Sequence, residues 1–147
     1  MKGYVEDIER HAVDNAAFRR VVYTGRHMQL VLMSLKAGEE IGAETHIDHD
    51  QFFRVEKGKG EVWIDGERRK IKRDVAVIVP AGARHNVVNT GAKSLKLYTL
   101  YAPPEHRDAV VRASKLEAEA TEEHFDGATT EAGSLPAGAA TADRRSQ

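Results

Sequence analysis

The sequence predicts an all-β domain, a sandwich or barrel of short strands. Between residue 19 and about residue 102 the chain is rich in Val, Leu, Ile, Phe and Tyr, and turn residues interrupt these apolar runs repeatedly. Hydrophobic residues make up 41% of the 147-residue chain, which is enough for one core. We therefore expect a single domain over residues 1–120. Residues 121–147 contain few large apolar residues and predict a flexible, disordered tail.

Short apolar segments bounded by turn residues are the candidate strands. They are Arg20–Thr24, Gln29–Leu35, Glu40–His46, Gln51–Lys57, Gly60–Ile64, Glu67–Ile71, Val75–Val79, His85–Asn89 and Leu95–Tyr101. Asp65-Gly66 is a type I′ hairpin signal, because both positions of that turn require a positive φ. Pro103-Pro104 ends the last strand, since proline cannot donate a ladder hydrogen bond.

Two helices are expected outside the strand region. A short N-terminal segment carries one over Asn15–Arg20. The other is a C-terminal helix from Glu105 to about Ala120, where alanine and glutamate, both good helix formers, are frequent.

Charge and composition exclude several classes of partner. The 22 Lys and Arg residues balance 23 Asp and Glu, and no long basic run predicts binding to nucleic acid or an anionic membrane. The absence of cysteine excludes disulfides and thiolate metal sites. The N-terminal residues are acidic where a signal peptide is apolar, and no apolar run is long enough for a membrane helix. We expect a cytoplasmic protein.

Two segments carry regularly spaced polar residues. The first reads Gly38, five residues, Glu44, one residue, His46, four residues, Gln51, six residues, Gly58. The second reads Asp74, five residues, Pro80-Ala81-Gly82, two residues, His85, three residues, Asn89. Together they resemble the two motifs of the cupin superfamily, G-x5-H-x-H-x3,4-E-x6-G and G-x5-P-x-G-x2-H-x3-N. Glu44 replaces the first histidine of that pattern, Gln51 its glutamate, and Asp74 its second-motif glycine.

This resemblance implies a double-stranded β-barrel, or jelly roll, over residues 28 to about 102. It also implies that Glu44, His46, Gln51 and His85 bind one metal ion. Strand periodicity agrees, because Glu44 and His46 share one strand face and Gln51 and His85 lie on faces of later strands. Four polar groups meeting inside an apolar barrel need partners, and one metal ion satisfies them all.

The substitutions keep the charge of such a site. The usual set has three neutral histidines and one carboxylate, and here the carboxylate has moved to Glu44 while the amide of Gln51 takes its place. Two imidazoles, one carboxylate and one amide oxygen suit a divalent transition metal, one of Mn, Fe, Co, Ni, Cu or Zn, better than Ca. Four protein ligands on a six-coordinate ion leave two positions for substrate or water.

Several alternatives stay open from the sequence. The polar residues could form a metal-free hydrogen-bonded cluster, or Asp48 or His49 could join His46 as ligands. We favour His49 as a solvated loop residue, because its odd spacing from His46 places it off the inward face. His27, at a strand entry, is the candidate catalytic base. His106 and His124 lie in polar segments without an expected role.

Three functions are compatible with these motifs. The favoured one is a metal-dependent enzyme with isomerase- or lyase-like Lewis-acid chemistry on a small polar or anionic metabolite, like the small proteins described as mannose-6-phosphate isomerase-like. Glu44, His46 and His85 also match the two-histidine, one-carboxylate set of non-haem iron dioxygenases. The third is a non-catalytic module that binds a ligand or metal. Outward-facing Phe52 and the apolar N-terminal strands predict a homodimer.

Overall fold

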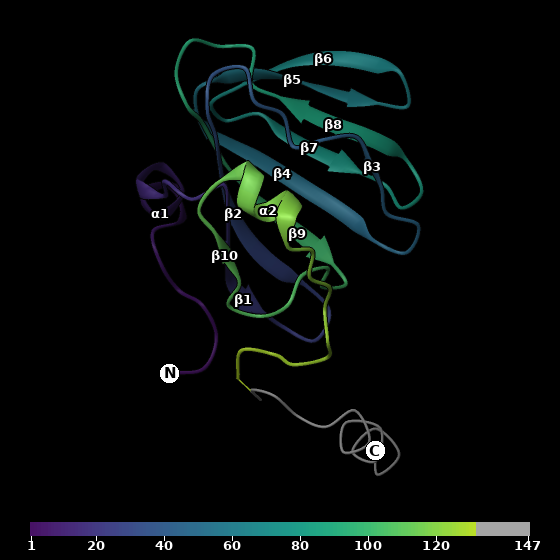
Figure 1. Cartoon of the computed structure of the whole chain (residues 1–147). Coiled ribbons are helices and arrows are strands. Elements are labelled where there is room, and N and C mark those ends of the chain that lie inside the picture. Colours follow the sequence, from purple (N-terminus) through teal and green to yellow (C-terminus); the bar gives the residue numbers. More distant parts are fainter. Residues whose placement is uncertain (132–147) are drawn as a thin grey trace.

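The computed structural model describes residues 1–131, which form two antiparallel sheets stacked face to face (Figure 1). The larger sheet has the order β10 (Val111–Arg112), β1 (Arg19–Thr24), β2 (Gln29–Leu35), β9 (Leu95–Ala102), β4 (Asp50–Lys57) and β7 (Ala76–Val79). The smaller has the order β3 (Glu44–Thr45), β8 (Arg84–Val88), β5 (Lys59–Ile64) and β6 (Glu67–Lys72). The two short helices are α1 (Ile8–Asp14) and α2 (Lys115–Ala120). The predicted all-β class is confirmed.

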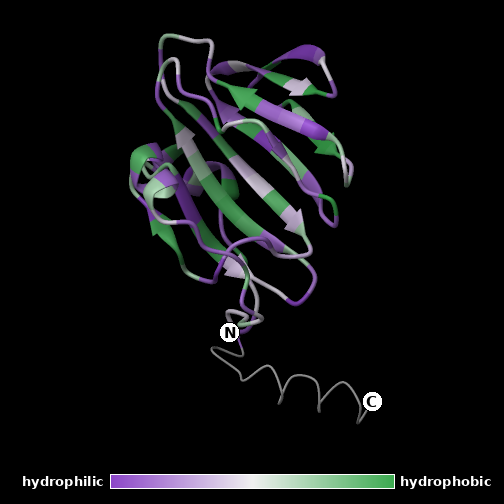
Figure 2. Cartoon of the chain, turned by 45° about the vertical axis from the view of Figure 1, so that its right-hand side comes forward, coloured by the Kyte–Doolittle hydropathy of each residue, from purple (hydrophilic) through white to green (hydrophobic). Residues whose placement is uncertain are grey.

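The core lies between the two sheets and follows the period-two pattern of the strands. On β4, Gln51, Phe53 and Val55 are buried, and Phe52 and Arg54 between them are partly exposed. Alternate residues of β9, from Leu95 to Tyr101, are buried in the same way. Figure 2 shows hydrophobic and hydrophilic residues alternating along these strands. Burying one large apolar side chain contributes roughly 1.5–3 kcal/mol, so this interior stabilises the chain around the polar residues that it encloses.

Two turns explain unusual residues in the sequence. Asp65 and Gly66 have φ values of 48° and 87°, and Ile64 pairs with Glu67, so the predicted hairpin between β5 and β6 is confirmed. Asp74 has a φ of 72°, in the left-handed region that favours glycine. Aspartate is one of the few other residues that tolerate this conformation, which explains how it replaces glycine in the second motif.

The N-terminal helix precedes its predicted position. We expected it over Asn15–Arg20, but α1 ends at Asp14. The Asp7 carboxylate caps its start by accepting the Arg10 N–H at 3.1 Å. The Asn15 side chain bonds both the N–H and the carbonyl of Ala17, which ends the helix and turns the chain into β1.

The C-terminal helix is shorter than the predicted span from Glu105 to Ala120. Only α2 is helical, and the Ser114 hydroxyl caps it by accepting the Glu117 N–H. Val111 pairs with Arg20 at the edge of the larger sheet, and Val110 is buried. Burial of Val110 and the strand pairing of Val111 outweigh the helix propensity of the segment.

Two further boundaries differ from the prediction. Residues 121–131 continue along the barrel, with the Phe125 N–H donating to the Glu105 carbonyl and the Thr130 N–H to that of Thr24. The tail therefore does not begin at residue 121, and the rest of the predicted tail, 132–147, lies outside the described residues. The expected strand Glu40–His46 is reduced to β3, with a separate bridge between Glu40 and Val88, because Gly42 has a φ of 111°.

Candidate metal centre

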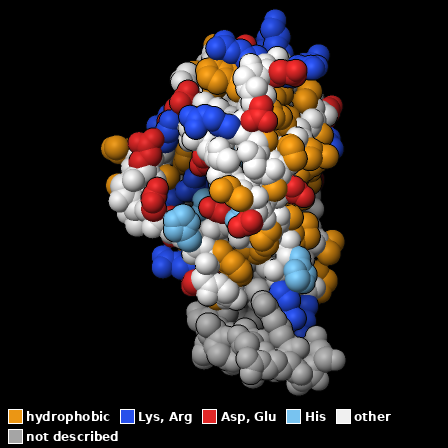
Figure 3. Space-filling view, turned by 90° about the vertical axis from the view of Figure 1, so that its right-hand side faces the viewer, with side chains coloured by type: hydrophobic (Ala, Val, Ile, Leu, Met, Phe, Trp, Pro, Cys, Tyr) orange, Lys and Arg blue, Asp and Glu red, His pale blue; other side chains and the backbone are white. Residues whose placement is uncertain are grey.

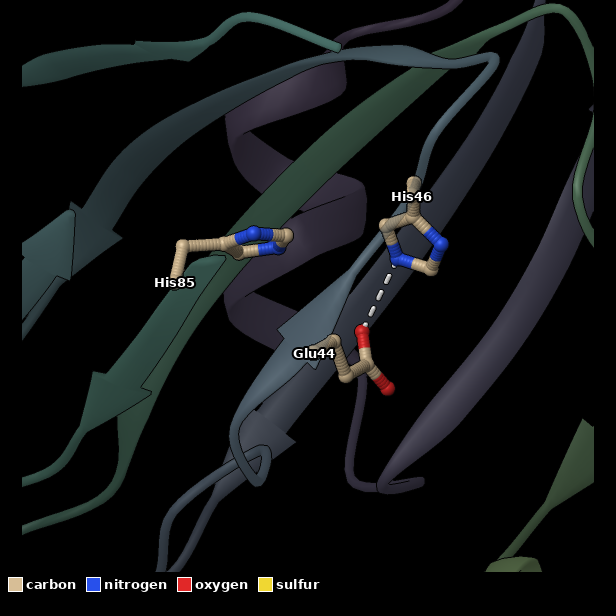
Figure 4. Close-up of side chains that lie close together, drawn as sticks. All are labelled: Glu44, His46 and His85. Carbon is tan, nitrogen blue, oxygen red and sulfur yellow. Dashed lines mark hydrogen bonds and ion pairs between the residues drawn. The ribbon is translucent and has the colours of Figure 1, made fainter. Parts of the chain in front are cut away.

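The candidate centre lies where the short strand β3 meets β8. Glu44 and His85 are directly paired across these antiparallel strands, so their side chains leave the same face of the smaller sheet. His46 follows β3 two residues after Glu44. Figure 4 shows the His85 ring pointing towards Glu44 and His46, which are joined to each other. The ligand atoms of these three residues lie within 4.8 Å of one another.

Gln51 completes the predicted set of four from the opposite sheet. Its Oε1 lies 3.0 Å from His85 Nε2, and its amide N–H donates to the Thr99 hydroxyl at 3.0 Å. Glu44 Oε2 and His46 Nε2 are also 3.0 Å apart. Two ligands at right angles on a metal, each bonded at about 2.1 Å, are about 3.0 Å apart, so both pairs match an edge of an octahedral site.

The His85 ring is oriented by the backbone beside it. Its Nδ1 lies 3.1 Å from the Ala83 carbonyl, which only accepts hydrogen bonds, so Nδ1 carries the proton. Burial lowers the pKa of His85, which keeps the ring neutral. Nε2 then presents a lone pair to Gln51 Oε1, another electron-pair donor. Two such donors aimed at each other are an arrangement that a cation stabilises.

His46 has the opposite electrostatic setting. Its hydrogen bond with Glu44 raises the pKa of His46, and the nearby Glu105 carboxylate acts in the same direction, against the effect of burial. The Tyr101 ring lies edge-on to His46 with centroids 5.8 Å apart. Burial raises the pKa of the Tyr101 phenol, so its hydroxyl stays protonated beside the cluster.

The structure also brings residues to the centre that sequence reasoning did not place there. His49, which we interpreted as a solvated loop residue, has Nε2 3.1 Å from both Glu105 Oε2 and the Pro104 carbonyl. Glu105 Oε2 is 3.8 Å from His46 Nδ1. His46, His49 and Glu105 thus form a second group of potential ligands. No motif marks Glu105, and its only sequence signal is that it directly follows the prolines that end β9.

Other predicted residues lie elsewhere. His27 is exposed in the turn between β1 and β2, and among residues 1–131 no hydrogen bond or ion pair joins it to the cluster. Asn89, the last residue of the second motif, is buried and donates to the Leu35 and Lys93 carbonyls, so its role is to fix loops. His106, expected to have no role, is buried beside Tyr101 with ring centroids 5.2 Å apart.

Comparisons with known proteins agree with this architecture. Residues 31–101 match the family model described as Cupin domain. The uncharacterized protein YrkC of Bacillus subtilis is 44% identical over 128 residues, covering 83% of this chain and 69% of YrkC. The crystal structure of BH2720 from Bacillus halodurans is 43% identical with a TM-score of 0.80, over 82% of this chain and 96% of that one. TT1209 from Thermus thermophilus is 26% identical with a TM-score of 0.61, over 67% and 96%. Within the described residues, no helix is long and apolar enough to span a membrane.

Proposed function

The chain belongs to the cupin superfamily, and on this basis we propose that it binds one divalent transition metal for Lewis-acid chemistry on a small polar metabolite. Glu44, His46, Gln51 and His85 are the ligands in this proposal. The observation that supports this proposal most directly is the distance of 3.0 Å between His85 Nε2 and Gln51 Oε1. The Ala83 carbonyl holds the His85 proton at Nδ1, so both of these atoms are electron-pair donors.

Each ligand contributes a distinct property. Glu44 supplies the negative charge, and it lies beside His46 on the more exposed side of the centre. His85 and Gln51 are buried, so they form the inner wall. When bound, the metal would polarise a substrate oxygen as a Lewis acid. Tyr101 is buried edge-on against His46 and keeps its hydroxyl protonated next to the ligands.

The test is the metal content of purified protein measured by elemental analysis. We expect about one transition metal ion per chain in wild type, and its loss in Glu44→Ala and in His85→Ala. His27→Ala is the matched control, because it removes a histidine that is exposed in a turn. If wild type stays empty after metal is added, the proposal fails. A 180° flip of the Gln51 side-chain amide would then place its N–H against His85 Nε2, so that Gln51 and His85 would be hydrogen-bonded to each other without a metal.

An iron dioxygenase is the second candidate. It is favoured by the composition of the cluster Glu44, His46 and His85, two histidines and one carboxylate, which non-haem iron oxygenases use. The Phe53 ring lies 6.2 Å from that of His85 and makes one side of the centre aromatic. Iron in the purified protein together with substrate-dependent oxygen uptake would support it, whereas manganese, nickel or zinc without oxygen uptake would support the Lewis-acid function.

A further inference from the structure

A cavity of about 310 Å³ lies on the outer face of the smaller sheet. Trp63 of β5 is paired with Asn86 of β8 on one side and with Arg68 of β6 on the other, and all three residues line the cavity. His85 is one residue out of phase with Asn86, and its ring points into the candidate metal centre (Figure 4). The cavity is therefore behind that centre, and its volume suits a small molecule.

The lining of this cavity is positively charged. The described residues that line it include two guanidinium groups, those of Arg68 and Arg84, and no carboxylate. Two carboxylates of the same hairpin have other partners, since Asp65 Oδ1 accepts the backbone N–H of Arg84 at 2.9 Å and Glu61 Oε2 accepts the indole N–H of Trp63 at 3.3 Å. Within residues 1–131, neither guanidinium forms an ion pair with an acid. Both are therefore free to bind an anion.

Arg68 is already positioned for such binding. Its guanidinium lies over the Trp63 ring, 4.3 Å from the ring centroid. This cation–π contact uses the flat face of the guanidinium, whereas the N–H groups lie in its plane and stay available as donors. Because stacking restricts the side chain before a ligand arrives, less conformational entropy is lost when the ligand binds.

Asn86 provides an independent sign of a ligand. Its Oδ1 accepts the Gly42 N–H at 2.9 Å, and this fixes the orientation of the amide because only the oxygen can accept. Its Nδ2 group, which can donate two hydrogen bonds, then has no acceptor among residues 1–131. Asn86 is only 4% exposed, and it lines the cavity. Buried polar groups are almost always hydrogen-bonded, so an acceptor belongs in the cavity beside Nδ2.

The charge of the surrounding face agrees with an anionic ligand. The outward positions of β5, β6 and β8 hold five basic side chains and one acidic side chain, those of Lys59, Arg68, Lys70, Lys72, Arg84 and Glu61. Figure 3 shows Lys and Arg side chains gathered at the top of the molecule, the end where Figure 1 places β5 and β6. Such a face attracts anions and repels cations.

We propose that this cavity binds a small organic oxyanion, a carboxylate or a phosphate ester, whose charged group lies between Arg68, Arg84 and Asn86. The flat or apolar part of the ligand packs against the Trp63 ring. Guanidinium groups bind carboxylates and phosphates through paired, charge-assisted hydrogen bonds, and the Asn86 N–H adds a neutral donor. The ligand class follows from a lining that offers donors and positive charge together.

This site is separate from the candidate metal centre. His85 touches the cavity, but its Nδ1 lies 3.1 Å from the Ala83 carbonyl and its Nε2 lies 3.0 Å from Gln51 Oε1. Neither ring nitrogen is left for a molecule in the cavity. The inference therefore goes beyond the proposed function and holds whether or not a metal is bound.

Trp63 makes the site directly testable, because it is the only tryptophan in the sequence and its fluorescence reports on the cavity. Three probes that share one ring and differ in charge are titrated at pH 7: benzoate, benzamide and benzamidine. We expect benzoate to bind about tenfold or more tightly than neutral benzamide, and cationic benzamidine to give no saturation. Phenyl phosphate is titrated in parallel, and the tighter of the two oxyanions assigns the ligand as a phosphate ester or a carboxylate.

Asn86→Asp is the most direct variant, since a carboxylate still accepts the Gly42 N–H but puts a negative charge in place of the free donor. It should weaken benzoate binding about tenfold or more, and Arg68→Gln should weaken it about tenfold. Arg69→Gln is the matched control, because Arg69 is exposed and lies one residue out of phase on the same strand, 3.5 Å from Glu67. Thermal unfolding checks that each variant folds, and if Asn86→Asp does not, Arg68→Gln decides.

Benzamide or benzamidine binding as tightly as benzoate would overturn the inference, and so would an unchanged benzoate affinity in Arg68→Gln. A lack of saturation by both oxyanions up to about 10 mM would also overturn it. The titrations are made on zinc-loaded and on metal-free protein, and we expect equal affinities. Benzoate binding that requires zinc would assign the anion to the metal centre, which would remove this site and support the proposed function.

Discussion

Gln51 differs from the other three candidate ligands because its side chain does not titrate and because it reaches the centre from the larger sheet. Its position in β4, paired with Tyr101 of β9 and Val79 of β7, places its amide against His85 of the opposite sheet. Its side chain also bonds Thr99, so the amide is held at both ends. The geometry of one residue therefore depends on how the two sheets are packed.

Gln51→Glu should tighten metal binding. A carboxylate in place of the amide adds a second anionic ligand, and the Thr99 hydroxyl, which accepts from Gln51, can donate to glutamate instead. We expect affinity for zinc to rise about tenfold or more, and to fall in Gln51→Leu, which lacks a ligand atom. Competition with a chromophoric chelator measures both. Equal affinities in wild type, Gln51→Glu and Gln51→Leu would place Gln51 outside the coordination sphere.

His106 should make stability depend on pH. Burial and the nearby Arg19 lower its pKa to about 3. The positive charges that His46 and His124 can carry act in the same direction, and a hydrogen bond with the Glu123 backbone opposes them without offsetting the effect. The unfolded chain binds this proton with a pKa near 6.5. Between pH 6.5 and about 3 the unfolded state thus holds more protons, and stability falls as the pH falls.

The expected slope approaches about 1.4 kcal/mol per pH unit in this window. Urea unfolding at pH 7, 6 and 5 of wild type and His106→Gln isolates this contribution, since other titrating groups act equally in both proteins. The free energy of unfolding of wild type should fall more steeply than that of the variant. Parallel curves would mean that folding does not lower the pKa of His106.

Helix α2 and residues 121–131 pack against the barrel, and we call them together the C-terminal clasp. The clasp covers a cavity beside the metal centre and is fastened at Glu123, whose carboxylate lies 3.0 Å from Arg112 and 3.7 Å from Arg19. All three side chains are largely buried. The clasp is thus held to the barrel by ion pairs with Arg19 of β1 and Arg112 of β10.

Glu123→Ala should destabilise the protein strongly. It leaves two buried guanidinium groups without their carboxylate, and breaking a buried ion pair from one side costs about 3–5 kcal/mol. Glu122→Ala is a matched control, because that neighbouring residue is exposed. Thermal unfolding should show a large loss for Glu123→Ala alone, and limited proteolysis should cleave it faster after α2. Equal behaviour of the two variants would show that Glu123 does not fasten the clasp.

The outer face of the larger sheet carries an apolar row across four strands. Leu30 pairs with Leu100, Leu100 with Phe52, and Phe52 with Ile78. Ile78 is 69% exposed, and the other three are partly exposed. A contiguous apolar row of this kind on a sheet face is typical of a protein interface, which agrees with the predicted homodimer.

The homodimer stays a prediction at the scale of the whole molecule. We expect light scattering after size-exclusion chromatography to give twice the chain mass for wild type. Ile78→Lys should shift the equilibrium to monomers, because it places a charge in the apolar row, whereas Arg69→Ala on the exposed edge strand β6 should not. A monomeric wild type, or a dimer unaffected by Ile78→Lys, would exclude this surface as the interface.

Much of the fold could be read from the sequence because its signals are local. Alternation along Gln51–Lys57 and Leu95–Tyr101 fixes which side chains face the core, and Asp65-Gly66 fixes a hairpin. Motif spacing placed Glu44, His46, Gln51 and His85, and the structure brings these four side chains together. The helix limits were predicted poorly, because capping by Asp7 and Asn15 and the pairing of Val111 with β1 outweigh local propensity.

The sequence by itself determined the all-β class, the strand positions and the four polar residues of the centre, since strand periodicity and motif spacing act over a few neighbouring residues. Only the tertiary structure decided that His49 and Glu105 join His46, and that Glu123 closes a cavity beside them. Glu105 and Glu123 are separated from the motifs along the chain, and they approach them through the packing of the segments after β9 and of the C-terminal clasp against the barrel. No local sequence pattern encodes such a contact, because it depends on how whole strands and helices pack against one another in the folded chain.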